Sequence, residues 1–169
     1  MSIVIVLAMH GAPPKDFPKD ELSEFFSLHT QLGHVPQHVR DKIKPRYDEL
    51  DYKMRTWPRS EKNDPFYIGA HKMAQHLGEA TGFEVIIGYN EFCAPELIEA
   101  ITFAQKKSPE KIIVITPMMT RGGEHSEIEI PKAIELAQKL DPGIPIVYAW
   151  PFDVSELAQF LYSQIKRFI

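Results

Sequence analysis

The chain has 169 residues, which is enough for one domain of ordinary size and too short for two full ones. Its net charge of −4 argues against a nucleic-acid binder, which needs a basic surface. No apolar run reaches the roughly 18 residues of a membrane span, and the apolar stretch at residues 3–9 is too short for a signal-peptide core. A single cysteine, Cys93, excludes an internal disulfide and predicts a reducing, cytoplasmic setting.

Four short apolar segments, rich in Ile and Val, are spaced along the chain. They are residues 3–9, 83–89, 111–117 and 144–150. Each is nearly continuous rather than alternating, which is typical of strands that are covered on both faces in a parallel sheet. The sequence therefore predicts a parallel four-stranded sheet.

Segments with helical spacing of their apolar residues separate these strands. One begins at Asp64-Pro65, an N-cap followed by proline, and ends at Gly82. Others carry apolar stripes over residues 97–104, 133–140 and 154–168. This alternation predicts a single three-layer α/β domain over residues 1–169, with helices on both faces of the sheet and right-handed crossovers.

Residues 13–63 interrupt the alternation, at a place where a connection of about two to six residues is usual. Helical patterns at residues 19–32 and 36–54 predict a helical insertion within the domain. Residues 40–62 hold eight basic and five acidic residues, the only local basic excess in the chain. The candidates for a basic lip over a site are Lys15, Arg40, Lys42, Lys44 and Arg46.

Side chains that can bind a metal ion or transfer protons follow three of the predicted strands. Ligands of parallel α/β sheets bind beyond the carboxyl ends of the strands, near the point where strand order reverses. His10, Glu91 and His125 all lie just past predicted strand ends. If the spatial order is 2-1-3-4, the reversal falls between the two strands that deliver the histidines. Two imidazoles and a carboxylate there can bind a metal ion, act as acid and base, or supply a nucleophile.

The remaining histidines and the cysteine give weaker signals. His34 and His38 have the spacing of a metal-binding pair on a helix, but Pro36 between them argues against a continuous helix. His71 and His76 are five residues apart and point to different sides of a helix. We expect these side chains at the surface, and Cys93 as a buried, inert thiol.

The motifs at the strand ends form a series that resembles a known family. They are His10-Gly11, then Gly88-Tyr89-Asn90-Glu91 leading into Ala94-Pro95-Glu96-Leu97, then Ile115-Thr116-Pro117-Met118-Met119, Gly122-Gly123-Glu124-His125 and Glu129-Ile130-Pro131. In order and spacing the chain resembles the small class II chelatases that act on sirohydrochlorin and related tetrapyrroles. The resemblance covers residues 1–12 and about 64–169, and is sharpest from residue 117 to 131.

The resemblance implies a chelatase-like fold with flavodoxin-like strand order. It also implies ATP-independent insertion of Co²⁺, Fe²⁺ or Ni²⁺, as a substrate, into a tetrapyrrole, with no organic cofactor. By match of motifs, His10, Glu91 and His125 are the expected catalytic and metal-binding residues. The small members of this family act as homodimers, so a homodimer is expected. The expected substrate-binding residues around the site are Gly11, Met118, Arg121, Gly122 and Gly123.

Two other functions remain as alternatives for a chain with these motifs. A non-catalytic carrier or sensor of a metal ion or tetrapyrrole would use the same three residues. A cleft covered by the insertion would favour such retention, and an open cleft would favour turnover. A histidine phosphatase also carries His-Gly after its first strand, but it needs an arginine directly before the histidine, where this chain has Met9.

Overall fold

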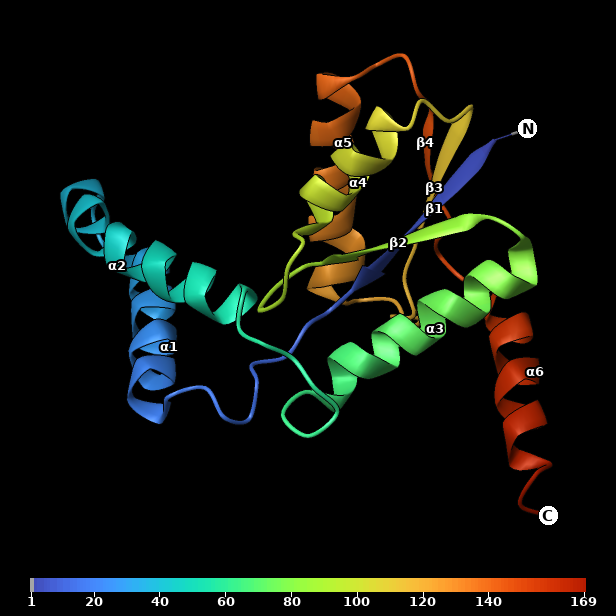
Figure 1. Ribbon diagram of the computed structural model, residues 1–169, viewed down its shortest axis with the longest axis horizontal. Helices are drawn as coiled ribbons and strands as arrows, with labels where there is room; N and C mark the ends of the chain where they lie inside the picture. Colours follow the sequence, from blue (N-terminus) through green and yellow to red (C-terminus); the bar gives the residue numbers. More distant parts are fainter. Residues whose placement is uncertain (1) are drawn as a thin grey trace.

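The computed structural model describes residues 2–169. In this part of the chain, four parallel strands form one sheet in the order β2-β1-β3-β4 (Figure 1). β1 (Ile3–Met9) pairs with β2 (Glu84–Tyr89) on one side and with β3 (Lys111–Ile115) on the other, and β4 (Ile146–Tyr148) is the outer strand next to β3. The reversal of strand order falls between β1 and β3, which confirms the predicted flavodoxin-like order.

The strands are slightly shorter than predicted because prolines flank them. β3 ends two residues before Pro117, and β4 lies between Pro145 and Pro151. Proline has no backbone N–H to donate to a neighbouring strand, so the ladder of hydrogen bonds stops near each of these residues. The predicted ranges 111–117 and 144–150 therefore include residues that continue into the loops.

Helices cover both faces of the sheet, as predicted. α4 (Leu97–Lys106) and α5 (Ile130–Leu140) pack on one face, over the largest cluster of buried apolar side chains. α3 (Pro65–Thr81) packs on the other face, where Ala70 and Ala74 contact side chains of β1 and β2. This side-chain packing explains the continuous apolar runs of the inner strands.

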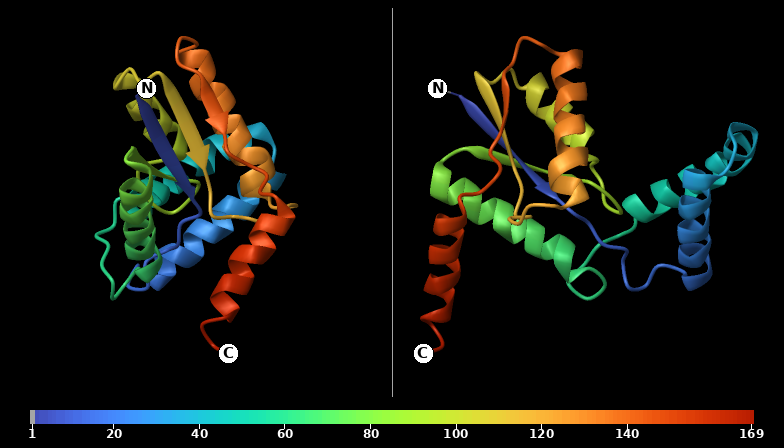
Figure 2. Two further views of the ribbon diagram at one scale, coloured as in Figure 1. Left: turned by 90° about the vertical axis from the view of Figure 1, so that its right-hand side faces the viewer. Right: turned by 180° about the vertical axis from the view of Figure 1, so that it is seen from behind.

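The predicted insertion is a pair of helices, α1 (Lys19–His34) and α2 (Gln37–Arg55), separated at Pro36. This arm extends to one side of the sheet (Figure 2) and has its own small core. Phe25 of α1 lies in that core with Phe92, which belongs to the loop after β2. The arm is therefore packed against the loop that carries Glu91.

Arg59 fastens the arm to the sheet from a buried position. Its side chain is 4% exposed and pairs with Asp64, 1% exposed, at 2.5 Å. Its guanidinium also donates to the backbone carbonyls of Ala12, Met54 and Phe92 at 2.7, 2.7 and 2.5 Å. Asp64 in turn caps the first turn of α3. One buried ion pair thus joins the loops after β1 and β2 to the end of the arm and the start of α3.

α6 (Val154–Ile165) is a helix, as predicted, and Asp153 caps it by accepting from the backbone N–H groups of Ser155 and Glu156. Its apolar stripe predicts a helix packed on the sheet. Instead, α6 runs away from the sheet, and none of its described residues is buried (Figures 1 and 2). Among the residues described, no helix has the length and apolar character that crossing a membrane requires.

Candidate metal centre

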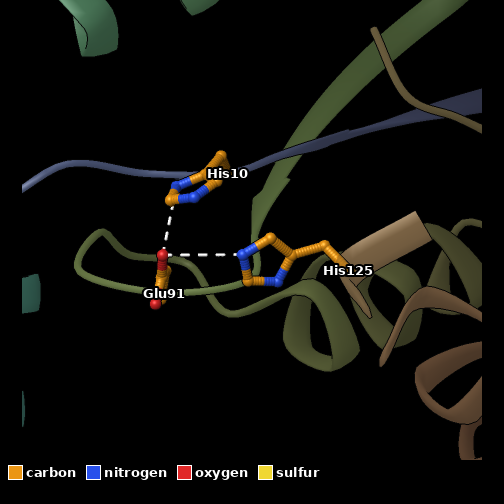
Figure 3. Close-up of side chains that lie close together, drawn as sticks. All are labelled: His10, Glu91 and His125. Carbon is orange, nitrogen blue, oxygen red and sulfur yellow. Dashed lines mark ion pairs between the residues drawn. The ribbon is translucent and has the colours of Figure 1, made fainter. Parts of the chain in front are cut away.

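Three side chains from separate loops meet at the carboxyl edge of the sheet (Figure 3). His10 follows β1, Glu91 follows β2, and His125 begins the helical segment after β3. Oε1 of Glu91 lies 3.1 Å from Nδ1 of His10 and 3.6 Å from Nε2 of His125. One ligand atom from each residue lies within 4.8 Å of the other two. The structure thus brings together the three residues that the sequence singles out.

Gly11 allows the loops that carry His10 and Glu91 to approach each other. Its φ is +120°, and a Cβ built on it would lie 1.9 Å from the carbonyl oxygen of Glu91. The backbone N–H of Glu91 donates to the carbonyl of His10 at 3.2 Å. Any side chain at position 11 would push these loops apart, so the glycine is required by close backbone contact.

His125 stands on a single π-helical turn, η1 (His125–Glu129), which leads directly into α5. The backbone N–H of Ile130 donates to the carbonyl of His125, five residues back. Pro131 has no N–H to continue an α-helical ladder through this segment. Such turns recur at functional sites. Here the turn sets His125 and Glu129 on the same side of the segment.

Glu129 fixes the orientation of the His125 ring. Its Oε2 lies 2.7 Å from Nδ1 of His125, and the side-chain amide of Asn90 donates to the same oxygen at 3.1 Å. With a carboxylate as its partner, Nδ1 carries the hydrogen, and the lone pair of His125 is on Nε2. That lone pair faces Glu91.

The centre is therefore built for a cation. Nε2 of His125 and Oε1 of Glu91 are both lone-pair donors and lie 3.6 Å apart. Nδ1 of His10 lies 2.6 Å from the carbonyl of Gly11, so it carries a hydrogen and leaves Nε2 as its lone-pair nitrogen. Two neutral imidazoles and a carboxylate match the ligand preference of divalent iron, cobalt and nickel. A carboxylate behind the imidazole, as Glu129 is, further increases its basicity as a ligand.

The centre is open to solvent on one side. The side chains of His10, Glu91 and His125 are 45%, 31% and 23% exposed. Glu91 also borders a cavity of about 170 Å³ between the arm and the sheet edge. Aromatic side chains of the arm line it, namely Phe25, Phe26, His29 and Tyr47. Burial raises the pKa of Tyr47 to about 12, so this hydroxyl stays protonated at neutral pH.

The predicted substrate-binding residues lie in two surroundings. Gly122, with φ +90°, is open to solvent, and Gly123 begins the turn before His125. Arg121 is exposed, pairs with Glu127 at 3.1 Å and lies over the ring of Trp150. Met118 is part-buried and packs against the sheet core.

Two of the five residues of the predicted basic lip pair with carboxylates within the arm. Lys44 pairs with Asp48, and Arg46 pairs with Glu24 and Glu49. Arg40 donates to the carbonyl at the end of α1. The basic excess of residues 40–62 therefore serves partly to hold the two helices of the arm together.

The other histidines lie outside the three-residue cluster. His34, His38, His71 and His76 are exposed. Cys93 is buried, and burial raises the pKa of its thiol.

The sequence does not predict the roles of two residues beside the centre. Glu129 enters the sequence argument only as part of a motif, and Asn90 only as a neighbour of Glu91. The signal for Glu129 was available, since a histidine and a glutamate four residues apart face each other on a helix. Nothing comparable marks Asn90, because its partner lies 39 residues away.

Comparisons with known proteins identify the family of the chain. The CbiX family model matches residues 64–167. A sirohydrochlorin cobaltochelatase from Methanopyrus kandleri is 32% identical over 71 residues, which are 41% of this chain and 49% of that protein. The chain therefore spans about half the length of the curated relative it matches.

Two solved structures resemble the chain in shape. A cobalamin (vitamin B12) biosynthesis CbiX protein from Marinobacter aquaeolei VT8 aligns with a TM-score of 0.56 at 16% identity, over 98% of this chain and 95% of that one. The sirohydrochlorin chelatase SirB from Bacillus subtilis subspecies spizizenii, in complex with cobalt, aligns with a TM-score of 0.48 at 16% identity, over 99% of this chain and 51% of that one. The first alignment supports the fold. Because the family model covers more than half of the chain, the protein belongs to the CbiX family.

Proposed function

We propose that this protein is a metal chelatase that inserts a divalent ion, Co²⁺ in the first place, into sirohydrochlorin or a closely related tetrapyrrole without ATP. The observation that carries the proposal is that one possible ligand atom from each of His10, Glu91 and His125 lies within 4.8 Å of the other two at the open edge of the sheet. Membership of the CbiX family and the name of the Methanopyrus kandleri relative support the substrate and the choice of cobalt.

The first step is capture of the ion by these three residues. Neutral imidazoles and a carboxylate replace part of the hydration shell of the ion and hold it at the surface where a macrocycle can reach it. Glu129 and Asn90 keep Nε2 of His125 directed at the ion. The carboxylate of Glu91 offsets one of the two positive charges.

The second step is exchange of the ion for protons. Insertion forms bonds from the metal to the pyrrole nitrogens and releases two N–H protons. As the ion leaves, it frees the lone pairs of His10, Glu91 and His125, which can accept these protons and pass them to water. The two positive charges that the ion brings into the macrocycle equal the charges of the two protons that leave it. The exchange therefore conserves charge and needs no nucleotide.

The macrocycle is larger than the cavity of about 170 Å³ beside Glu91, so it lies across the open edge of the sheet. We assign its contacts to Gly11 and to the loop before η1, with Met118, Arg121, Gly122 and Gly123. The exposed glycine at position 122 lets a flat ring approach the backbone, and Arg121 is placed to meet a substrate carboxylate in exchange for its surface pair with Glu127.

Turnover fits the exposure of the centre better than storage does. A carrier would cover its ligand, whereas the His10 side chain is 45% exposed and the arm forms a wall beside Glu91. We further propose that the protein acts as a homodimer, in line with the resemblance found in its motifs.

The test is an anaerobic absorbance assay with sirohydrochlorin and Co²⁺, Fe²⁺ or Ni²⁺ in turn. Wild-type protein is compared with His10→Ala, Glu91→Gln and His125→Ala. His76→Ala is the matched control, because His76 is exposed on the outer surface of α3. We expect metal insertion above the uncatalysed rate in the wild type and the control, and a loss of at least about 100-fold in the three site variants.

No acceleration with any of the three ions would contradict the proposal. Tight binding of the ion or the macrocycle without conversion would instead identify a carrier. Full activity in His125→Ala would show that the ion is held elsewhere.

A further inference from the structure

α6 has an apolar face, and none of its described residues is buried. Val154, Leu161 and Ile165 on this face are 77%, 52% and 55% exposed. They recur at helical spacing together with Leu157 and Ala158, and Phe168 follows just past the end of the helix. A face of this size does not normally stay in water, because each large side chain buried from water contributes about 1.5–3 kcal/mol.

The face of the sheet on which α3 packs has a less covered region at β3 and β4, which we call the open half-sheet and define by Ile113 and Val147. The cluster under α3 covers β1, β2 and, at Ile115, the end of β3. Ile113 pairs in register with Val147, so both point to the same side, and Val147 is 46% exposed. Both faces of a parallel sheet are ordinarily covered by helices. We therefore expect a further helix over the open half-sheet.

α6 has the size that this region needs. Its 12 residues span about 18 Å, and the five residues of β3 span about 17 Å. However, α6 leaves the carboxyl edge of the sheet and continues away from it instead of returning along it (Figure 1).

The segment that leads into α6 is held by contacts of its own side chains. The indole N–H of Trp150 donates to the carbonyl of Met118 at 3.1 Å, and its ring stacks on Tyr148. Asp153 then caps the helix. A return to the open half-sheet of the same chain would have to reverse the direction of the chain within residues 151–153.

The solvent-accessible surface area of the chain also indicates that α6 is covered by another molecule. The chain exposes 10425 Å² to solvent. A compact monomer of this mass exposes about 8,500 Å². Two chains that each buried the difference would bury roughly 3,800 Å² in total, which lies within the range of permanent homodimers. α6 and the arm are the projecting elements that share this excess.

We propose that two copies of the chain exchange α6, so that the apolar face of each helix covers the open half-sheet of the other copy. Such an exchange is reciprocal and closes with twofold symmetry, because the same chain supplies both the helix and the surface that receives it. The exchange specifies the contact of the proposed homodimer and does not depend on the chelatase activity.

The first experiment measures the mass of the full chain in solution by light scattering. Wild type is compared with Leu161→Glu, which places a charge on the apolar face, and with Ser163→Glu, which places the same charge on the opposite side of the helix. We expect a dimer for the wild type and for Ser163→Glu. Leu161→Glu should raise the dissociation constant of the dimer at least about 100-fold.

The second experiment locates the helix. Two chains with different tags, one with Val147→Cys and one with Leu157→Cys or Leu161→Cys, are co-expressed and oxidised. We expect a disulfide between the differently tagged chains, in excess over links between identical chains. In a chain that carries both cysteines, the expected product is a covalent dimer.

The outcomes separate the exchange from the homodimer. A monomeric wild type overturns both, and a disulfide within one chain would then show that α6 closes on its own sheet. A dimer that tolerates Leu161→Glu, or that forms no link between position 147 and α6 of the partner, overturns the exchange and leaves the homodimer standing.

Discussion

Glu129 holds His125 from behind: its Oε2 lies 2.7 Å from Nδ1, on the side of the ring away from the Nε2 that faces Glu91. Both residues belong to one π-helical turn. The arrangement of a carboxylate, an imidazole and a metal position is one that metal sites use to fix ring orientation and raise ligand basicity. Glu129 is therefore a positioning residue for the metal centre.

Removing this carboxylate is predicted to weaken metal binding without removing a ligand. Glu129→Ala should lower the affinity for Co²⁺ by about 10- to 100-fold, and Glu129→Gln should lower it less, because its amide oxygen still accepts from Nδ1. Calorimetric titration with Co²⁺ measures both, and the ¹⁵N shifts of His125 report the tautomer. Glu127→Gln, in the same turn but paired with Arg121, is the control. Equal affinities in all four proteins would refute the positioning role.

Gly11 is predicted to tolerate no side chain. Gly11→Ala places a Cβ 1.9 Å from the carbonyl oxygen of Glu91 on a backbone with φ +120°, so the loop that carries Glu91 must move. We expect a lower Tm and loss of Co²⁺ binding. Gly33→Ala in α1 is the matched control, since nothing lies within 4 Å of its Cβ. It should be neutral or stabilise the protein by up to about 1 kcal/mol. If Gly11→Ala behaves like Gly33→Ala, the close approach of the two loops is wrong.

The buried pair of Arg59 and Asp64 is predicted to be essential for stability. Arg59→Met leaves the Asp64 carboxylate buried without its cation, which costs about 3–5 kcal/mol in the free energy of unfolding. Arg46→Met breaks an exposed pair with Glu24, which solvent screens, and should lower the free energy of unfolding far less. Urea denaturation followed by circular dichroism measures both. A small effect of Arg59→Met would mean that other contacts anchor the arm.

Cys93 is predicted to be unreactive in the folded protein. Burial raises the pKa of its thiol, and the reactive species is the thiolate. A higher pKa means a smaller thiolate fraction at any given pH below it, and burial also blocks access. A disulfide reagent at pH 8 should therefore label less than one thiol per chain on the minute scale, and one thiol once urea unfolds the protein. Rapid, complete labelling of the native protein would contradict the buried position.

Much of the fold follows from the pattern of apolar residues. Continuous Ile- and Val-rich runs predict the parallel sheet, and the rule on strand ends brings His10, Glu91 and His125 together before any coordinates are known. The exact ends of β3 and β4 were missed because apolar character continues past the flanking prolines, whereas backbone hydrogen bonding does not.

Other features depend on contacts that no local pattern encodes. Asn90 reaches Glu129 only after β2 and η1 are placed side by side. The packing of Phe25 on Phe92 likewise joins the arm to a loop far along the chain. The stripe on α6 predicts a helix packed on the sheet, whereas none of its described residues is buried, because a stripe does not specify which surface covers it.

The central claim is that His10, Glu91 and His125 hold the incoming ion, and Co²⁺ binding in the absence of tetrapyrrole tests it most directly. The visible ligand-field absorption of Co²⁺ is titrated against the wild type, His10→Ala, Glu91→Gln, His125→Ala and the control His76→Ala. We predict one ion per chain in the wild type and the control, and affinity weakened by at least about 10-fold in each site variant. Unchanged affinity in all three site variants would contradict the claim.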